Sequence, residues 1–368
     1  MELVSPRRAA ARLFALALLL AGCAAERPPL IVPGRPAAGP LIDQLLPQAV
    51  HDRAGWSADI RASFAAERLV PSRESLCAVI AIIEQESGFQ VDPVVPNLGT
   101  IAWKEIERRA RADDIPLVLV HAALALDSSD GRTYAQRIRA ARTEKELSDT
   151  YEDFIGQAPL GRRLFAGWNP IRTRGPMQVN VAFAERYAAR RPYPFPLPRS
   201  LDDELFTRRG SLYFGIAHLL DYRAPYDRYL YRFADYNSGQ YASRNAAFQR
   251  ALHLASGITV DPDGALLPEG DTTANAGSTE RAALALARRL ALTPREVHAA
   301  LELGREEDFE RSALYRRVFA LAERRAGEPL PRAAVPHIEL AGPKLTRRLT
   351  TAWYARRVEA RFERCTAR

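Results

Sequence analysis

The fold is decided by the stretch Leu76-Cys77-Ala78-Val79-Ile80-Ala81-Ile82-Ile83-Glu84-Gln85-Glu86-Ser87-Gly88-Phe89. Its apolar residues recur at helical spacing and share one face, which predicts a helix with a buried stripe. We expect Ser72 to cap the first turn of this helix and Gly88 to end it. Glu86 falls at the edge of the stripe, where partial desolvation raises the pKa of a carboxyl. A general acid at neutral pH requires such a pKa, so Glu86 is a candidate catalytic residue.

Spacing alone does not choose between Glu86 and Glu84, which lies at the opposite edge of the same stripe. Two later stretches add information: Gly175-Pro176-Met177-Gln178-Val179-Asn180 and Tyr236-Asn237-Ser238-Gly239. Each is by itself only a turn signal, because proline fixes φ, and Asn and Gly tolerate left-handed backbone. Gln178 offers both a hydrogen-bond donor and an acceptor, which suits a sugar amide.

Taken in order, the three stretches resemble the motifs of the soluble lytic transglycosylase family, relatives of goose-type lysozymes. The family's catalytic glutamate directly precedes Ser-Gly-Phe. Its Gly-Leu-Met-Gln segment is similar to residues 175–178, with Pro176 in place of leucine, and its Ala-Tyr-Asn-Ala-Gly segment is similar to the third stretch. The segment from Gly215 resembles the helix beneath the family's sugar groove. The resemblance implies these site residues: Glu86 as the acid, Ser87, Met177 and Gln178 in the groove, Tyr236 against the acid, and Asn237 at the N-acetyl group.

The activity implied is that of a peptidoglycan lyase, which cleaves the β-1,4 bond between N-acetylmuramic acid and N-acetylglucosamine and leaves a 1,6-anhydro end. Glu86 would act first as the acid and then as the base. Two alternatives stay open. One is a hydrolysing lysozyme, with Asp92 or Asp235 as the base, and the other is a catalytically silent lysozyme-like adaptor that binds the cell wall. No cofactor or metal is expected, because neither the six histidines nor the cysteines show metal-ligand spacing.

The N-terminus resembles a bacterial lipoprotein signal peptide. Three arginines precede a short apolar run, residues 13–20, which leads into Leu20-Ala21-Gly22-Cys23. The run is too short for a bilayer core of about 30 Å. We expect Cys23 to carry the lipid, palmitate included, and to anchor the chain in the outer membrane facing the periplasm, because Ala24 rather than Asp follows it. The alternative is an ordinary cleaved secretory signal.

The composition indicates a well-packed globular chain with a basic surface. It has 368 residues, 47% of them hydrophobic, and a formal net charge of +8. In the periplasm the anionic partners of a basic surface are peptidoglycan carboxylates and lipid headgroups. The export signal argues against nucleic acid. Cys77 and Cys365 can form a disulfide in this oxidising compartment or stay as free thiols.

The predicted fold class is mainly α, with a lysozyme-like domain. We divide the chain into a signal peptide (1–22), a Pro-rich linker (23–40), a catalytic domain (41–254) with a helical insertion at about 99–166, and a helical C-terminal extension (255–368). The insertion departs from the family, and it is too long for a structureless loop. It could wall the groove, set the length of bound glycan, or block the site. Helices are expected at residues 59–69, 101–112, 115–126, 144–154, 278–290, 294–303, 310–325 and 345–364.

Overall fold

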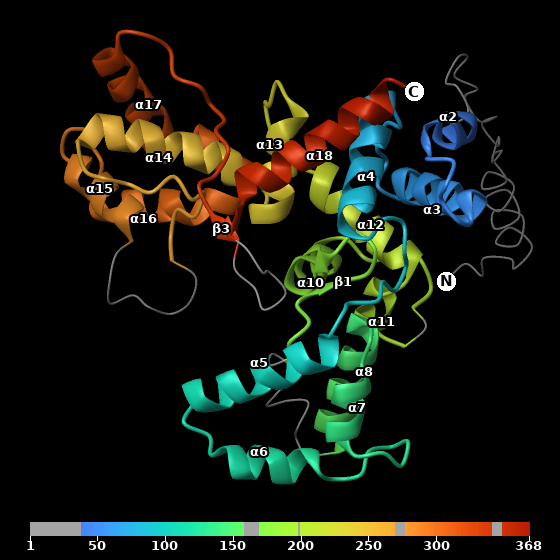
Figure 1. Cartoon of the computed structure of the whole chain (residues 1–368). Coiled ribbons are helices and arrows are strands. Elements are labelled where there is room, and N and C mark those ends of the chain that lie inside the picture. Colours follow the sequence, from blue (N-terminus) through green and yellow to red (C-terminus); the bar gives the residue numbers. More distant parts are fainter. Residues whose placement is uncertain (1–37, 158–168, 198, 269–276, 341–347) are drawn as a thin grey trace, which may run out of the picture. The chain divides into compact units, whose positions relative to one another are not determined.

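A computed structural model of the chain describes residues 38–157, 169–197, 199–268, 277–340 and 348–368. Within these ranges the fold is mainly α, as predicted, with two short antiparallel hairpins (Figure 1). The predicted signal peptide and Cys23 lie outside the described residues. No helix of the described part combines the length and apolar character that crossing a bilayer requires.

The first hydrophobic core surrounds α4 (Arg73–Glu86). Ser72 caps this helix as predicted, because its hydroxyl accepts a hydrogen bond from the Ser75 amide at 3.1 Å. Every residue from Ser75 to Ile83 is buried, so α4 is enclosed on all sides rather than along a single stripe. The surrounding elements are α2 (Ala38–Leu45), α3 (Arg53–Ala66), β2 (Val179–Asn180), α10 (Val181–Arg190), α11 (Leu201–Leu205), α12 (Arg208–Leu220), α13 (Tyr229–Ser238) and α18 (Thr351–Thr366). The strand β1 (Thr173–Arg174) pairs with β2.

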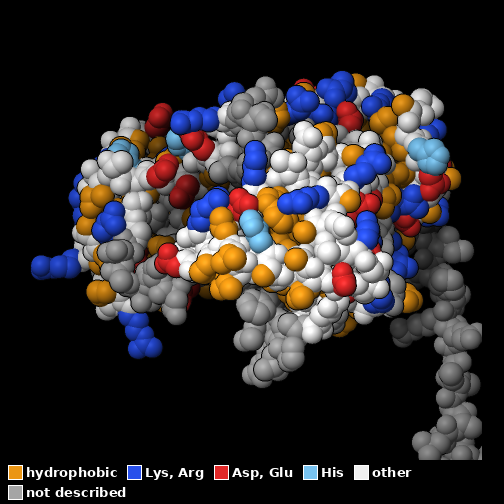
Figure 2. All heavy atoms as spheres, turned by 60° about the horizontal axis from the view of Figure 1, so that its bottom comes forward, with side chains coloured by type: hydrophobic (Ala, Val, Ile, Leu, Met, Phe, Trp, Pro, Cys, Tyr) orange, Lys and Arg blue, Asp and Glu red, His pale blue; other side chains and the backbone are white. Residues whose placement is uncertain are grey.

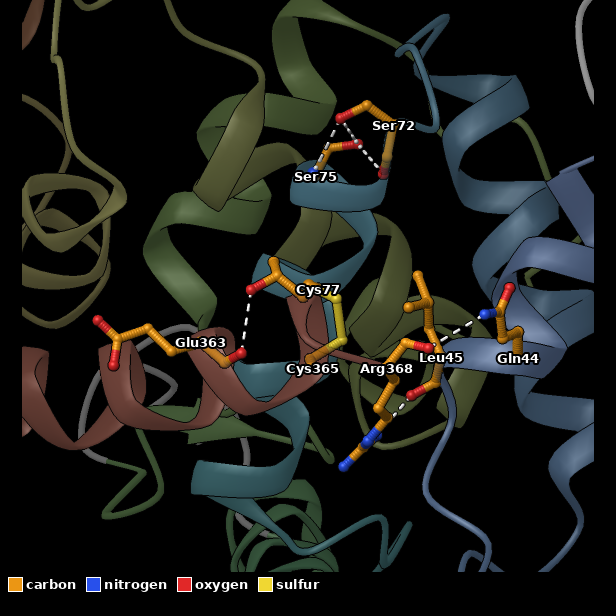
Figure 3. Close-up of a disulfide and its surroundings, with 9 residues drawn as sticks. Gln44, Leu45, Ser72, Ser75, Cys77, Glu363, Cys365 and Arg368 are labelled. Carbon is orange, nitrogen blue, oxygen red and sulfur yellow. Dashed lines mark hydrogen bonds between the residues drawn. A yellow bond between two sulfur atoms is a disulfide. The ribbon is translucent and has the colours of Figure 1, made fainter.

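The last helix, α18, completes this first core. It follows a small hairpin, β3 (Glu339–Leu340) and β4 (Leu349–Thr350), and packs against both α4 and α13 (Figure 1). A disulfide joins Cys365 to Cys77, with their Cα atoms 5.5 Å apart, so of the two alternatives left open by the sequence the bridge is the one present (Figure 3). At the end of the chain, the Arg368 carbonyl accepts a hydrogen bond from Gln44 of α2 at 3.1 Å (Figure 3).

A second hydrophobic core forms between α14 and the helices that follow it. Phe248 of α14 lies within 6.4 Å of Phe309, Tyr315 and Phe319, measured between ring centroids. The elements of this core are α14 (Ala242–Ser256), α15 (Ser278–Leu286), α16 (Pro294–Glu302), η2 (Leu303–Arg305), η3 (Glu307–Arg311) and α17 (Ala313–Ala326). The predicted boundary at 254/255 therefore differs from the division of the cores: α14 belongs with the helices that follow it, whereas α18 returns to the first core.

In the described part of the insertion, four helices pack around a small core that Ile171 and Phe206 also join. The helices are α5 (Leu98–Ala112), α6 (Leu117–Leu124), α7 (Tyr134–Ala140) and α8 (Glu144–Gln157). Three of them were predicted, and α7 was not. Val118 and Leu119 of α6 are 72% and 60% exposed. Hydrophobic side chains also gather on the face of the molecule that Figure 2 shows.

The disulfide should contribute measurably to stability, because it closes a loop of 288 residues in the unfolded chain. On the chain-entropy model such a loop contributes up to about 5 kcal/mol. We expect the double variant Cys77→Ser/Cys365→Ser to unfold at a markedly lower urea concentration than the oxidised wild type. A reducing agent should destabilise the wild type and leave the double variant unchanged. Equal unfolding midpoints for the oxidised wild type and the variant would contradict this role.

Candidate active site

Glu86 is the last residue of α4 and is half-buried. The chain turns sharply after it, because Gly88 and Phe89 both have left-handed backbone, with φ of 58° and 65°. The strained turn at Phe89 is held by packing: the Phe89 ring meets Trp56 of α3 edge to face, 5.2 Å between centroids. The turn thus ends α4 where its final carboxyl leaves the core.

The Glu86 carboxyl accepts a hydrogen bond from the Tyr354 hydroxyl of α18. Burial raises the pKa of Glu86 to about 7, even though the Tyr354 hydrogen bond and the positive charge of Arg361 both lower it. Desolvation therefore outweighs the two groups that favour the ionised form. At neutral pH this carboxyl exists in both protonation states, which is the condition for giving and then taking a proton.

Tyr236 takes a different partner from the one predicted. Its hydroxyl donates to the backbone carbonyl of Met177 at 2.7 Å, whereas the hydroxyl on Glu86 comes from Tyr354. Burial, followed by the nearby charge of Glu86, raises the pKa of Tyr236. The physical reason for the difference is that α13 directs Tyr236 to the backbone of the second stretch, while α18 supplies a second tyrosine. Tyr236 therefore ties the second and third stretches together beside Glu86.

The second stretch forms the turn of the β1–β2 hairpin. Gly175 has a φ of 69°, and its carbonyl accepts a hydrogen bond from the backbone N–H of Gln178 at 2.9 Å, which closes the turn. Met177 is fully buried against Gly215 of α12, where a Cβ would lie 2.5 Å from the Met177 sulfur. The helix that contains Gly215 thus packs against this hairpin, as the resemblance implies.

The side chain of Gln178 is engaged within the protein. Its carbonyl oxygen accepts from the Thr173 hydroxyl at 2.8 Å, and its amide donates to the Glu144 carboxylate at 3.0 Å. We predicted that the carbonyl and the amide of Gln178 would be open to a sugar, but in the structure each has a partner within the protein. Glu144 is the first residue of α8, so Gln178 fastens the insertion to the hairpin. A sugar would therefore meet a half-buried Gln178 whose carbonyl oxygen and amide nitrogen each already have a partner within the protein.

Asn237 and Ser87 occupy the remaining predicted positions. Asn237 is exposed at the end of α13, and its carbonyl oxygen accepts from the Thr351 hydroxyl of α18 at 2.9 Å. The hydroxyl of Ser87, directly after Glu86, donates to the Ile83 carbonyl at 3.2 Å. The first turn of α18 therefore brings Thr351 to Asn237 and Tyr354 to Glu86.

The two aspartates considered as bases for water differ in access. Asp235 is buried, and its carboxylate accepts from the hydroxyls of Tyr222 and Tyr226 and from the amides of Tyr241 and Ser243. Burial raises the pKa of Asp235 to about 6. With both oxygens engaged it holds the start of α14 and is not placed to activate water. Asp92 is an exposed residue on the loop after α4, and desolvation of its carboxyl raises its pKa.

Three residues of the site were missed by the sequence analysis: Tyr354, Thr351 and Glu144. The only signal for the first two is the cysteine pair. Cys365 lies eleven residues after Tyr354 on a predicted helix, and Cys77 lies nine residues before Glu86, so a bridge between the cysteines brings the helix of Tyr354 alongside that of Glu86. Nothing local marks Glu144. Among the described residues no group of three His, Cys, Asp or Glu side chains is arranged to hold a metal ion.

Comparisons with known proteins name no activity. Residues 49–368 match the model of a family described as "Protein of unknown function (DUF1615)". An uncharacterized protein YaiW of Escherichia coli strain K12 is 45% identical over 350 residues, which cover 95% of each chain. No solved structure matches.

The hydrogen bond from Tyr354 should lower the pKa of Glu86, because a donor stabilises the ionised carboxylate. We expect Tyr354→Phe to raise this pKa above its wild-type value of about 7. The measurement is a carboxyl-carbon NMR titration in protein labelled at glutamate. Tyr315→Phe, in the second core, is the matched control and should leave the Glu86 titration unchanged. A pKa that stays the same or falls in the Tyr354 variant would contradict the assigned contact.

Ionised Glu86 should lower the free energy of unfolding at high pH. Its folded pKa of about 7 lies above the ordinary glutamate pKa of 4.5, so unfolding releases a proton between these pH values and the free energy of unfolding falls as pH rises through them. The loss amounts to at most about 3 kcal/mol. We expect Glu86→Gln, compared with the wild type by urea unfolding, to gain stability at about pH 8 relative to about pH 4. A difference between the two proteins that does not change with pH would contradict the raised pKa.

Proposed function

The chain belongs to the DUF1615 family, and we propose that it is a lytic transglycosylase that cleaves peptidoglycan, with Glu86 as the general acid and base. The observation that carries the proposal is the desolvated Glu86 carboxyl, with a pKa of about 7, at the end of α4. Tyr236 and Met177, from the other two stretches of the resemblance, are joined by a hydrogen bond and share the core with α4. Several weak motifs in one order and one place support a single site more strongly than each does alone.

In the proposed reaction, protonated Glu86 donates to the glycosidic oxygen between N-acetylmuramic acid and N-acetylglucosamine. The bond from that oxygen to the muramoyl C1 breaks, and the sugar's own N-acetyl oxygen stabilises the positive centre. Ionised Glu86 then takes the proton of the muramoyl C6 hydroxyl, whose oxygen bonds to C1 and closes the 1,6-anhydro ring. Substrate assistance of this kind needs no second carboxylate. Glu86 ends the cycle protonated, as it began.

The surroundings of Glu86 suit the two halves of this cycle. Burial favours the protonated acid that starts the reaction, and the Tyr354 hydroxyl stabilises the carboxylate that follows. Asp235 is buried with its oxygens engaged, which favours an internal hydroxyl over water as the attacking group. We propose the first core, with α4 at its centre, as the lysozyme-like domain.

The proposed location follows from the N-terminus. Lipid on Cys23 would anchor the chain in the outer membrane, facing the periplasm, where peptidoglycan strands are within its reach. The residues between Cys23 and α2 include four prolines, a composition typical of extended tethers. The basic composition suits the carboxylates of the cell wall.

A second candidate function is a cell-wall adaptor that binds glycan without cutting it. One observation favours it: the side-chain carbonyl of Gln178 accepts from Thr173, and its side-chain amide donates to Glu144 of the insertion. The insertion therefore engages a group that the enzyme would offer to a sugar. Both functions place the glycan beside Glu86. They differ in whether Glu86 is needed for bond cleavage or only lies beside bound glycan.

Replacement of the acid separates the two. We expect Glu86→Gln to reduce the release of soluble muropeptides from purified sacculi by about a hundredfold or more, since general acid catalysis contributes about that much. Glu84→Gln is the matched control: Glu84 is two residues away and faces Arg361 and Arg364 at 3.5 and 3.3 Å. It should keep the wild-type rate. Release at the wild-type rate by the Glu86 variant would remove the assignment, and release by neither protein, with both bound to sacculi, would indicate the adaptor.

A further inference from the structure

A cavity of about 610 Å³ lies where the first and second cores meet. Its walls come from the end of α10, the end of α12 with the residues that follow, the turn before α14, and the segment from Arg305 to Glu307. Pockets that bind small organic ligands have volumes of about 300–1,000 Å³. The cavity therefore has the size of a ligand site, and nothing in the proposed cleavage reaction uses it.

The cavity is separate from Glu86. Leu69, which lines it, precedes the first turn of α4, whereas Glu86 is the last residue of that helix. The 14 residues of α4 span about 21 Å at 1.5 Å per residue. A ligand in the cavity and a glycan bond at Glu86 would thus occupy opposite ends of α4.

Four arginines line the cavity: Arg190, Arg191, Arg223 and Arg305. The planar guanidinium group binds carboxylates through two parallel hydrogen bonds. Arg191 is fixed in the wall, because its guanidinium lies 2.7 Å from the buried Glu67 carboxylate and 3.2 Å from Asp221.

Arg190 and Arg223 are held more weakly. Arg190 is 3.7 Å from Glu306, with side chains that are 64% and 56% exposed. Arg223, 85% exposed, is 3.9 Å from Glu307, which has a shorter contact of 2.8 Å with Arg311. Exposed pairs at such distances contribute about 0–1 kcal/mol. The carboxylates of a ligand can therefore replace Glu306 and Glu307 at little cost, and the displaced glutamates are then placed to accept an ammonium group.

The rest of the wall is aromatic. The rings of Tyr222 and Tyr241 meet edge to face with centroids 5.1 Å apart, and both line the cavity. The Tyr222 hydroxyl is already donated to Asp235 at 3.0 Å, so this ring offers apolar surface to a ligand. The wall therefore combines paired cations, paired anions and apolar area within one small volume.

We propose that this cavity binds a short peptide that carries several carboxylates and at least one ammonium group. Carboxylates would lie on Arg190 and Arg223, the ammonium group on Glu306 or Glu307, and the peptide body on the tyrosine rings. Two sources supply such chemistry: the stem peptides of peptidoglycan and ordinary peptides of L-residues. Binding here does not depend on cleavage at Glu86.

Calorimetric titration of the purified full-length protein tests the proposal. The probe is the stem tetrapeptide L-alanyl-D-glutamyl-meso-diaminopimelyl-D-alanine. We expect it to bind, and we expect Arg190→Ala/Arg223→Ala to weaken binding about tenfold or more, since each loses a charge-assisted hydrogen bond. The matched control is Arg108→Ala/Arg111→Ala on α5, which removes the same charge from side chains that are 65% and 61% exposed. It should bind like the wild type.

The same titration identifies the source of the peptide and the result that overturns the site. An all-L peptide with the same charges distinguishes the sources, because tighter binding of the stem peptide indicates the cell wall and tighter binding of the all-L peptide indicates ordinary peptides. Glu86→Gln should bind the tetrapeptide normally, which separates this site from cleavage. Absence of binding at millimolar peptide, equal affinity of the Arg190/Arg223 variant and the wild type, or equal binding of a fully amidated tetrapeptide would each overturn the proposal.

Discussion

The contact between α4 and α18 is the interaction on which the site depends. Two links hold it: the Tyr354 hydroxyl on Glu86, and the disulfide between Cys77 and Cys365. The hydrogen bond joins the end of α4 to the start of α18, and the disulfide joins the first half of α4 to the end of α18. The two helices therefore run antiparallel. The residues joined at Glu86 are 268 positions apart in sequence, which means that the chain must fold to its last helix before the candidate acid has its surroundings.

The chemistry of Glu86 follows from a balance that this contact sets. Burial of the carboxyl raises its pKa, while Tyr354 and Arg361, both from α18, lower it. An acid in a dry pocket without a donor would stay protonated at neutral pH, and one among several donors would stay ionised. With one hydroxyl donor and one nearby cationic side chain, the pKa of Glu86 stays near neutrality, and the fold is less stable when this carboxyl is ionised.

The local parts of this arrangement could be predicted from the sequence, and the long-range parts could not. Ser72, the apolar spacing of α4 and the Gly175 turn are short-range signals, because caps and turns depend on neighbouring residues. The predicted partner of Glu86 was Tyr236, and this prediction was wrong, because Tyr354 makes the contact. Hydroxyls on two different helices lie near the same carboxyl, and the sequence does not tell them apart. The engagement of Gln178 by Glu144 was missed for the same reason, because it joins two segments that carry no mutual signal in sequence.

We propose that this member of the DUF1615 family cuts glycan strands by transfer to an internal hydroxyl rather than to water. The most direct measurement is mass spectrometry of the fragments that the purified protein releases from sacculi. The account predicts fragments with 1,6-anhydro ends, each lighter by one water molecule than the corresponding hydrolysis product. Fragments with reducing ends would contradict the transfer mechanism, and sacculi that bind the protein yet release nothing would contradict the enzyme.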